Sequence, residues 1–235
     1  MYPVPAIRSR GDGALRWYAR LVSSWSLDEV TGTRFDAHGA NNLAESAAIG
    51  SATGKLGLST NHIAAASRYL SVASNSTLQT GDINWTISLW FKAVDISLTT
   101  ILAGKDNVTA DREWQIGLTG SKPQLIVWNG NTTQVGSLTW GSALNSATWY
   151  HLTFGHDAIN ARLWVSVNNA TPQTAATTGA PGAGGAPLRV GGRPVAPASY
   201  FGGNIDEFNF WKRLVGKRQR SALYNGGSGL AYPFT

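Results

Sequence analysis

The chain is predicted to be all-β: a two-sheet antiparallel β-sandwich with one short C-terminal helix and an N-terminal arm. Three observations predict this fold class. Strand-sized runs alternate between apolar and polar residues with a period of two, which is the pattern of a half-buried strand. Clusters of Gly, Asn, Pro and Ser separate these runs. No long amphipathic stretch lies between them, which favours a sandwich over a helical or α/β fold.

The clearest strand is predicted at residues 85–94. Ile87, Leu89 and Phe91 fall on one face, whereas Trp90 falls on the other face among Thr, Ser and Lys residues. Such alternation places one face against a core. Similar strand-sized runs occur at residues 99–103, 113–119, 124–128, 133–139, 149–155, 162–168 and 187–191.

The chain divides into three predicted parts. Residues 1–20 form an extended basic arm, residues 21–215 form the sandwich, and residues 216–235 form a short helix and a tail packed on the sandwich. The helix is expected near residues 217–224, because an Asn-Gly-Gly sequence that ends helices follows it. Residues 170–186, rich in Thr, Ala, Gly and Pro, are expected to form a long surface loop.

The formal net charge of +6 is concentrated at the two ends of the chain. This distribution indicates contact with an acidic partner such as a capsid surface or a polyanionic glycan. Nucleic acid is disfavoured, because the predicted helix is too short to read DNA. The alternative is that the basic ends are only solvated. The basic residues concerned are Arg8, Arg10, Arg16, Arg20, Lys212, Arg213, Lys217, Arg218 and Arg220.

Composition also excludes several classes of protein. The chain has no Cys, so disulfides and thiolate chemistry are excluded. No apolar run approaches the roughly 20 residues that cross a bilayer, so no membrane contact is expected. The first residues lack the charged and apolar segments of a secretory signal. We therefore expect synthesis in the cytoplasm, with release by lysis or by assembly into a particle.

Four segments together resemble the laminin-G-like family of concanavalin-like jelly rolls, in its phage-borne type. They are VSSWSLDEVTGTRFDAHGANNL (22–43), WTISLWFKA (85–93), ATWYHLTFGHDAINARLWVSVNN (147–169) and FGGNIDEFNFWKRLVGKRQRSALYNGG (201–227). They occur in the order of the family's opening strand, central strand, paired strands and closing strand with helix. One departure is that Ala170 follows Asn169 where the family has an Asn-Gly or Asp-Gly turn. The arm lies outside the resemblance.

The resemblance implies a protein that binds glycans or proteins and is not an enzyme. Glycanases of this superfamily carry a Glu-x-Asp-x-x-Glu strand, because two carboxylates must flank the glycosidic bond. None of the four glutamates here begins such a motif. They are Glu29, Glu45, Glu113 and Glu207.

The resemblance also implies a structural calcium where the opening and closing strands meet. Asp206 has the parity of Phe208 in its strand, so its carboxylate is expected to lean toward the core and to need donors or a cation. Asp28, Glu29 and Asp36 are the other candidate ligands, since calcium takes six to eight oxygens. The alternative is that Asp206 accepts hydrogen bonds from turn amides.

Three tryptophans, Trp90, Trp164 and Trp211, lie opposite the apolar faces of their strands. Exposed indoles stack on sugar rings or anchor protein interfaces. We therefore consider them candidates for a glycan site or a subunit contact. The alternative is that a loop, the arm or another part of the fold covers them.

The arm supplies the candidate partner-binding residues Arg8, Arg10, Arg16, Trp17, Tyr18 and Arg20. The leading hypothesis is a virion surface component of a tailed phage: a decoration, fibre or tail-associated protein whose arm binds the capsid. Its partners would be the capsid or another virion protein, and copies of itself. The alternative is a carbohydrate-binding adhesion module located outside the cell or at a cell surface.

Overall fold

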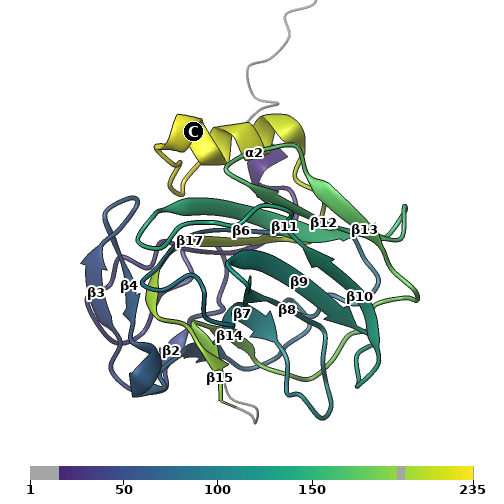
Figure 1. The fold of residues 1–235 in the computed structure, drawn as a ribbon, viewed down its shortest axis with the longest axis horizontal. Helices are drawn as coiled ribbons and strands as arrows, with labels where there is room; N and C mark the ends of the chain where they lie inside the picture. Colours follow the sequence, from purple (N-terminus) through teal and green to yellow (C-terminus); the bar gives the residue numbers. More distant parts are fainter. Residues whose placement is uncertain (1–15, 195–198, 235) are drawn as a thin grey trace, which may run out of the picture.

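The computed structural model describes residues 16–194 and 199–234. Two antiparallel sheets pack face to face, and the C-terminal helix lies across the outer face of one of them (Figure 1). This arrangement confirms the predicted two-sheet sandwich. Residues 1–15 of the predicted arm, which include Arg8 and Arg10, lie outside the described residues.

The first sheet contains eight of the described strands and carries the helix. β1 pairs with β17 beside the main path of the sheet. In spatial order the strands are β13 (Gln173–Ala176), β12 (Arg162–Val167), β11 (Tyr150–Asp157), β6 (Trp85–Ala93), β17 (Gly203–Trp211), β4 (Leu58–His62) and β3 (Gly50–Thr53), with β1 (Leu21–Trp25) on β17.

The second sheet faces the first across the core. Its seven described strands are, in spatial order, β10 (Gln134–Thr139), β9 (Lys122–Trp128), β8 (Trp114–Thr119), β7 (Thr100–Lys105), β14 (Leu188–Val190), β5 (Leu70–Val72) and β2 (Ala44–Glu45). Smaller elements are β15 (Gly192–Arg193), β16 (Ser199–Tyr200), α2 (Lys217–Tyr224), η1 (Ala64–Ala66) and η2 (Asn225–Gly227). None of the helices in the described ranges is long and apolar enough to span a membrane.

Strands with strong alternation were predicted well, and strands of small polar residues were not. β6 begins and ends within one residue of its predicted range, and α2 matches the predicted helix. β3 and β4 have the sequences GSAT and LSTNH, which carry little apolar signal and are strands because they pair with each other and with β17. The predicted loop at 170–186 is wrong in part, because β13 lies within it and pairs with β12.

The core fills the space between the sheets with the inward residues of their central strands. Trp85 of β6 and Trp114 of β8 come from opposite sheets, and their ring centroids are 5.6 Å apart. Phe154 of β11 contacts both rings at 6.1 and 5.9 Å. Such aromatic contacts across the sheets contribute both buried apolar area and a favourable ring geometry.

A β-bulge in β17 decides which face its residues occupy. The register between β17 and β6 shifts after Asp206, and Glu207 has a φ of 49°. The extra residue resets the alternation. Ile205 and Phe208 therefore both face the core, whereas Asp206 pairs with Trp90 on the outer face. The expectation that Asp206 leans toward the core is wrong.

The helix α2 covers the outer face of the first sheet (Figure 1). Arg220, Leu223 and Tyr224 lie on one side of it, because positions i, i+3 and i+4 share a helix face. Tyr224 stacks on Trp90, with ring centroids 5.8 Å apart, and the Arg220 guanidinium lies 5.4 Å from the ring centre of Trp164. Leu223 packs in a small cluster with Trp211 and Phe234.

Candidate functional site

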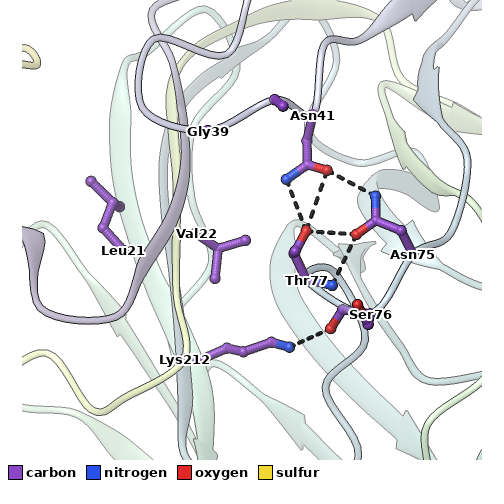
Figure 2. A pocket seen from close by; sticks show the side chains of 9 residues that line it. Leu21, Val22, Gly39, Asn41, Asn75, Ser76, Thr77 and Lys212 are labelled. Atoms are coloured by element: carbon purple, nitrogen blue, oxygen red, sulfur yellow. Dashed lines mark hydrogen bonds between the residues drawn. The ribbon is translucent and has the colours of Figure 1, made fainter.

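A groove of about 620 Å³ opens at the edge of the sandwich where β1 begins and β17 ends. Polar side chains from two loops form one wall, and Lys212 lies at its margin (Figure 2). We call it the asparagine groove. Its lining residues are Leu21, Val22, Gly39, Ala40, Asn41, Asn75, Ser76, Thr77 and Lys212.

A buried carboxylate shapes the loop on one side of the groove. Asp36 Oδ1 accepts hydrogen bonds from the backbone N–H groups of Ser24, His38 and Gly39 at 2.8–3.0 Å. Its Oδ2 accepts the N–H of Asn41 at 3.0 Å. Burial alone would raise the pKa of Asp36, but these backbone donors outweigh burial and lower it. The ionised side chain therefore fixes the loop that carries Gly39 and Asn41.

The polar wall is a hydrogen-bond network of two amides and two hydroxyls. Asn75 Nδ2 donates to Asn41 Oδ1 at 2.8 Å, and Asn41 Nδ2 donates to Ser23 Oγ at 2.8 Å. The Thr77 N–H and hydroxyl donate to Asn75 Oδ1 at 2.9 and 2.6 Å. Asn41 is buried whereas Asn75 and Thr77 are exposed. The network therefore holds two accessible polar side chains in fixed positions (Figure 2).

The margin of the groove carries one positive charge. Lys212 follows β17, and its ammonium group donates to the carbonyl of Ser76 at 2.7 Å. Partial burial lowers the pKa of Lys212, and the negative charge of Glu113 opposes this effect. The bond to Ser76 ties the end of β17 to the loop that carries Asn75.

A cluster of aromatic side chains surrounds His38, which is adjacent in the sequence to the lining residue Gly39. His38, which precedes Gly39, is exposed, and its ring stacks on Tyr18 with centroids 5.9 Å apart. Tyr232 meets Tyr18 edge-on at 5.9 Å and lies 6.0 Å from His38. Partly exposed aromatic rings of this kind offer faces for sugar rings or for apolar parts of a partner.

The titratable side chain among the residues that line the groove is Lys212. The groove contains no carboxylate, histidine or cysteine among the residues that line it. Hydrolysis of a glycosidic bond needs two carboxyl groups on opposite sides of that bond. Fixed amide and hydroxyl groups instead match the hydroxyl pattern of a polyol.

The three candidate tryptophans do face outward, but other parts of the chain cover them. Trp90, Trp164 and Trp211 are only 3%, 6% and 0% exposed. Tyr224 and Lys55 cover Trp90. Alternation predicted the face correctly, but the C-terminal helix and tail bury these indoles. Trp90 and Trp211 therefore offer no open ring face to a glycan or a subunit, whereas Trp164 is 6% exposed and lines a small cavity.

Asp206 accepts hydrogen bonds from a turn, as the alternative interpretation stated. Its Oδ2 accepts the N–H groups of Lys55 and Leu56 at 2.7 and 3.0 Å, whereas Oδ1 is buried without a partner. Burial raises the pKa of Asp206 to about 7. Burial, with the charges of Asp206 and Asp28, raises the pKa of the neighbouring Glu207 to about 9.

The other proposed calcium ligands are also engaged by backbone amides. Asp28 Oδ1 accepts the N–H of Leu58 at 2.7 Å, and Glu29 Oε1 accepts the N–H of Phe35 at 2.7 Å. Asp36 uses both oxygens in its own loop. Across the described residues, no three His, Cys, Asp or Glu side chains lie close enough together to hold a metal. As placed, these carboxylates do not fit a calcium site.

The described part of the arm packs on its own domain. The indole Nε1 of Trp211 donates to the Trp17 carbonyl at 3.0 Å, and the guanidinium of Arg213 donates to the Arg16 and Ala19 carbonyls at 2.7 Å each. Tyr18 Oη donates to the Phe234 carbonyl at 3.4 Å. Trp17 and Tyr18 therefore stabilise the sandwich, whereas the side chains of Arg16 and Arg20 are exposed.

The asparagine groove was not predicted from the sequence. Asn41 and Asn75 lie 34 residues apart, and neither belongs to a periodic strand. The local signal was an Asn-Ser-Thr sequence at 75–77, which is common in a chain rich in Ser and Thr. Only the fold brings this loop against the one that Asp36 organises.

Comparison with known proteins identifies the family. The family model described as the concanavalin A-like lectin/glucanases superfamily matches residues 64–219, which is more than half of the chain. No curated protein sequence matches significantly.

Three solved structures illustrate the likeness of fold. The binding domain of Paraclostridial Mosquitocidal Protein 1 has a TM-score of 0.69 at 13% identity over 88% of this chain and 52% of that one. The receptor-binding domain of botulinum neurotoxin mosaic serotype C/D has a TM-score of 0.68 at 13% identity, over 89% of this chain and 51% of that one. Domain 4 of the arabinanase AbnA from Geobacillus stearothermophilus was solved with arabinotriose. It has a TM-score of 0.61 at 20% identity, over 86% of this chain and 97% of that one.

The chain spans about half the length of the two toxin domains and nearly all of the arabinanase domain. At these identities the likeness establishes the fold alone. The family match agrees with the resemblance found in the four sequence segments and with the observed sandwich. The chain belongs to the concanavalin A-like lectin/glucanase superfamily.

Proposed function

We propose that this protein is a non-catalytic carbohydrate-binding module and that the asparagine groove is its binding site. The observation that carries the proposal is the hydrogen-bonded pair of Asn41 and Asn75. Because this pair and Thr77 are held by one another, a sugar would not have to order them on binding. Amides both donate and accept, so they suit the vicinal hydroxyls of a neutral glycan.

Structural neighbours support a role in binding. The arabinanase domain, which the chain matches over almost its whole length, was solved in complex with arabinotriose. The toxin neighbours are described as binding or receptor-binding domains. These neighbours favour recognition of a surface over chemistry on a substrate, and an extracellular or surface location follows from the same proposal.

The absence of catalysis is proposed from the placement of the acids. Asp206 and Glu207 are both nearly fully buried, so a glycosidic bond cannot be placed between them. Their burial also keeps both carboxyl groups out of contact with a substrate in solution. Incubation with polysaccharides should therefore release no reducing sugar.

The proposal is tested with a glycan array followed by calorimetry on each hit. Asn75→Ala removes one accessible amide from the groove and should weaken binding about tenfold. Asn131→Ala is the matched control, because Asn131 is exposed in another loop. Wild-type protein that binds no glycan, or an Asn75→Ala variant with undiminished affinity, would overturn the proposal.

The second candidate function is that of a virion surface component of a tailed phage, on which such a module would be displayed. Gln219 Nε2 donates to the Arg16 carbonyl at 3.3 Å, so the described part of the arm lies against the basic helix α2. Arg16, Arg20, Lys217 and Arg218 are exposed there. An acidic patch on a capsid would be attracted to these basic residues. Other copies of the chain would be neighbours of each bound copy on the particle.

Two measurements test the virion role. Mass spectrometry should detect the protein in purified particles, and Lys217→Glu with Arg218→Glu should weaken binding to particles that lack it. The same pair of changes should leave glycan binding in the asparagine groove intact. Its absence from virions, or particle binding that ignores the charge reversal, would refute this role.

A further inference from the structure

A second cavity lies between α2 and the edge of the first sheet. It has a volume of about 230 Å³, and we call it the Arg220 pocket. β11 and β6 separate its strand β12 from β17, so it is distinct from the asparagine groove. Its lining residues are Asp157, Arg162, Trp164, Pro172, Thr174, Leu214, Val215 and Arg220.

The back of the pocket is built from an indole and a guanidinium. Trp164 points outward from β12, and the Arg220 guanidinium lies 5.4 Å from its ring centre. The indole Nε1 of Trp164 is buried and has no acceptor. A Trp side chain usually finds a partner for this N–H when it is buried, so a residue that lines the pocket has a donor without a protein acceptor.

Arg220 carries a positive charge that no acid in the described chain neutralises. Its Nη1 donates to the Val215 carbonyl at 2.9 Å, while its Nε is buried without an acceptor. Burial lowers the pKa of Arg220, and no neighbouring carboxylate opposes this effect. A partly buried guanidinium normally has a carboxylate or phosphate partner. An anionic group in the pocket would supply that partner.

The second arginine of the pocket is already neutralised. Arg162 Nη2 lies 3.1 Å from Asp157 Oδ2, and Arg162 Nε donates to the same oxygen at 3.1 Å. Asn160 Nδ2 also donates to it at 2.7 Å. The two arginines and one aspartate therefore leave a net charge of one, which matches a carboxylate better than a doubly charged phosphate.

The size of the cavity limits what enters it. Pockets for drug-sized ligands begin at about 300 Å³, so a cavity of 230 Å³ holds roughly one ring. Thr174 lines the pocket from the edge strand β13 and is exposed, so its hydroxyl is available to a ring substituent. A ligand with one polar ring and one carboxylate would fit these limits, and an acidic monosaccharide is such a ligand.

We propose that the Arg220 pocket binds a carboxylate-bearing sugar, as a free monosaccharide or as one unit of an acidic glycan. The carboxylate pairs with Arg220, the ring lies beside Trp164, and Thr174 contacts a hydroxyl. This site gives the module a second, charge-selective contact. The inference stands on its own residues and does not depend on the asparagine groove.

Calorimetry with glucuronic acid and glucose tests the charge requirement, because these sugars differ at one carbon. Glucuronic acid should bind at least about tenfold more tightly than glucose. Inorganic phosphate separates a sugar site from a general anion site and should bind weakly. Equal binding of glucose, or phosphate binding as tight as that of glucuronic acid, would overturn the proposal.

Variants locate the site. Arg220→Gln should weaken glucuronic acid binding about tenfold, and Arg218→Gln, an exposed arginine on the same helix, should leave it unchanged. Because Arg220→Gln also alters helix packing, Thr174→Phe is the second variant: it fills the pocket and keeps the charge. Glucuronic acid binding that persists in either folded variant would place the sugar elsewhere and overturn the assignment.

The outcome is independent of the proposed function. Asn75→Ala should leave glucuronic acid binding intact, and Arg220→Gln should leave the ligand of the asparagine groove intact. Loss of both ligands in either variant would mean that the two sites are one, which contradicts the assignment of a separate pocket.

Discussion

Asp206 illustrates how one residue's role depends on a neighbour's backbone. The bulge at Glu207 turns the Asp206 carboxylate to the outer face, where it accepts two amide hydrogen bonds from the turn at Lys55 and Leu56. Strand alternation alone assigned it to the opposite face. A single residue with a positive φ therefore decides which groups this carboxylate can reach.

We expect calcium to have no effect on stability, because backbone amides already donate to the carboxylates that were its candidate ligands. Asp36 spends both oxygens on amides, and Asp206, Asp28 and Glu29 each accept at least one. We expect the thermal midpoint to be unchanged between excess calcium and a chelator, as measured by scanning calorimetry. An upward shift with calcium would mean that the loops rearrange into a ligand set.

At the scale of elements, the helix α2 determines the character of the first sheet's outer face. A sheet face that carries Trp90, Trp164 and Trp211 would be strongly apolar if it met solvent. The helix presents Arg220 and Tyr224 to two of these indoles, one turn apart. Helix and sheet are therefore complementary, and the helix packs on these two indoles.

Removing the apolar anchor of this helix should uncover the face. Leu223 is 2% exposed in the cluster with Trp211, so Leu223→Ala should lower the free energy of unfolding by about 2–4 kcal/mol. Urea denaturation followed by tryptophan fluorescence measures this loss. Ser221→Ala, exposed on the same helix, is the control and should change stability little. An equal effect of both changes would contradict the packing described.

At the scale of the whole molecule, the buried histidines and the buried acids make stability change with pH in opposite directions. Burial lowers the pKa of His62 from 6.5 to about 4 and that of His151 to about 3. Their contribution to stability is present above pH 6.5 and is lost as the pH falls through the folded pKa. Asp206 and Glu207 have raised pKa values, so their contribution is present at low pH and is lost as the pH rises.

The sum of these groups predicts the pH profile of stability. Between pH 4.5 and 6.5, the usual pKa values of Glu207 and the histidines, the two effects oppose each other and the thermal midpoint should vary little. Above pH 6.5 only the two acids titrate, so the midpoint should fall. Glu207→Gln should lessen this fall and be at least about 1 kcal/mol more stable than wild type at pH 8.

Thermal melts of both proteins from pH 4 to 9 check this profile. At pH 4 the wild type and Glu207→Gln should melt at nearly the same temperature, because Glu207 is mostly protonated there in both the folded and the unfolded state. A wild-type midpoint that rises between pH 7 and 9 would show that the carboxylate is ionised and paired instead.

The sequence by itself determined the strands with strong alternation, the helix α2, the family and the outward face of the three tryptophans. These features depend on contacts between residues close in the chain, or on motifs in a fixed order. The tertiary structure alone decided that those tryptophans are covered, that Asp206 changes face, and that Asn41 meets Asn75. Each of these depends on segments far apart in sequence, joined by strand pairing or by helix packing that no local pattern encodes.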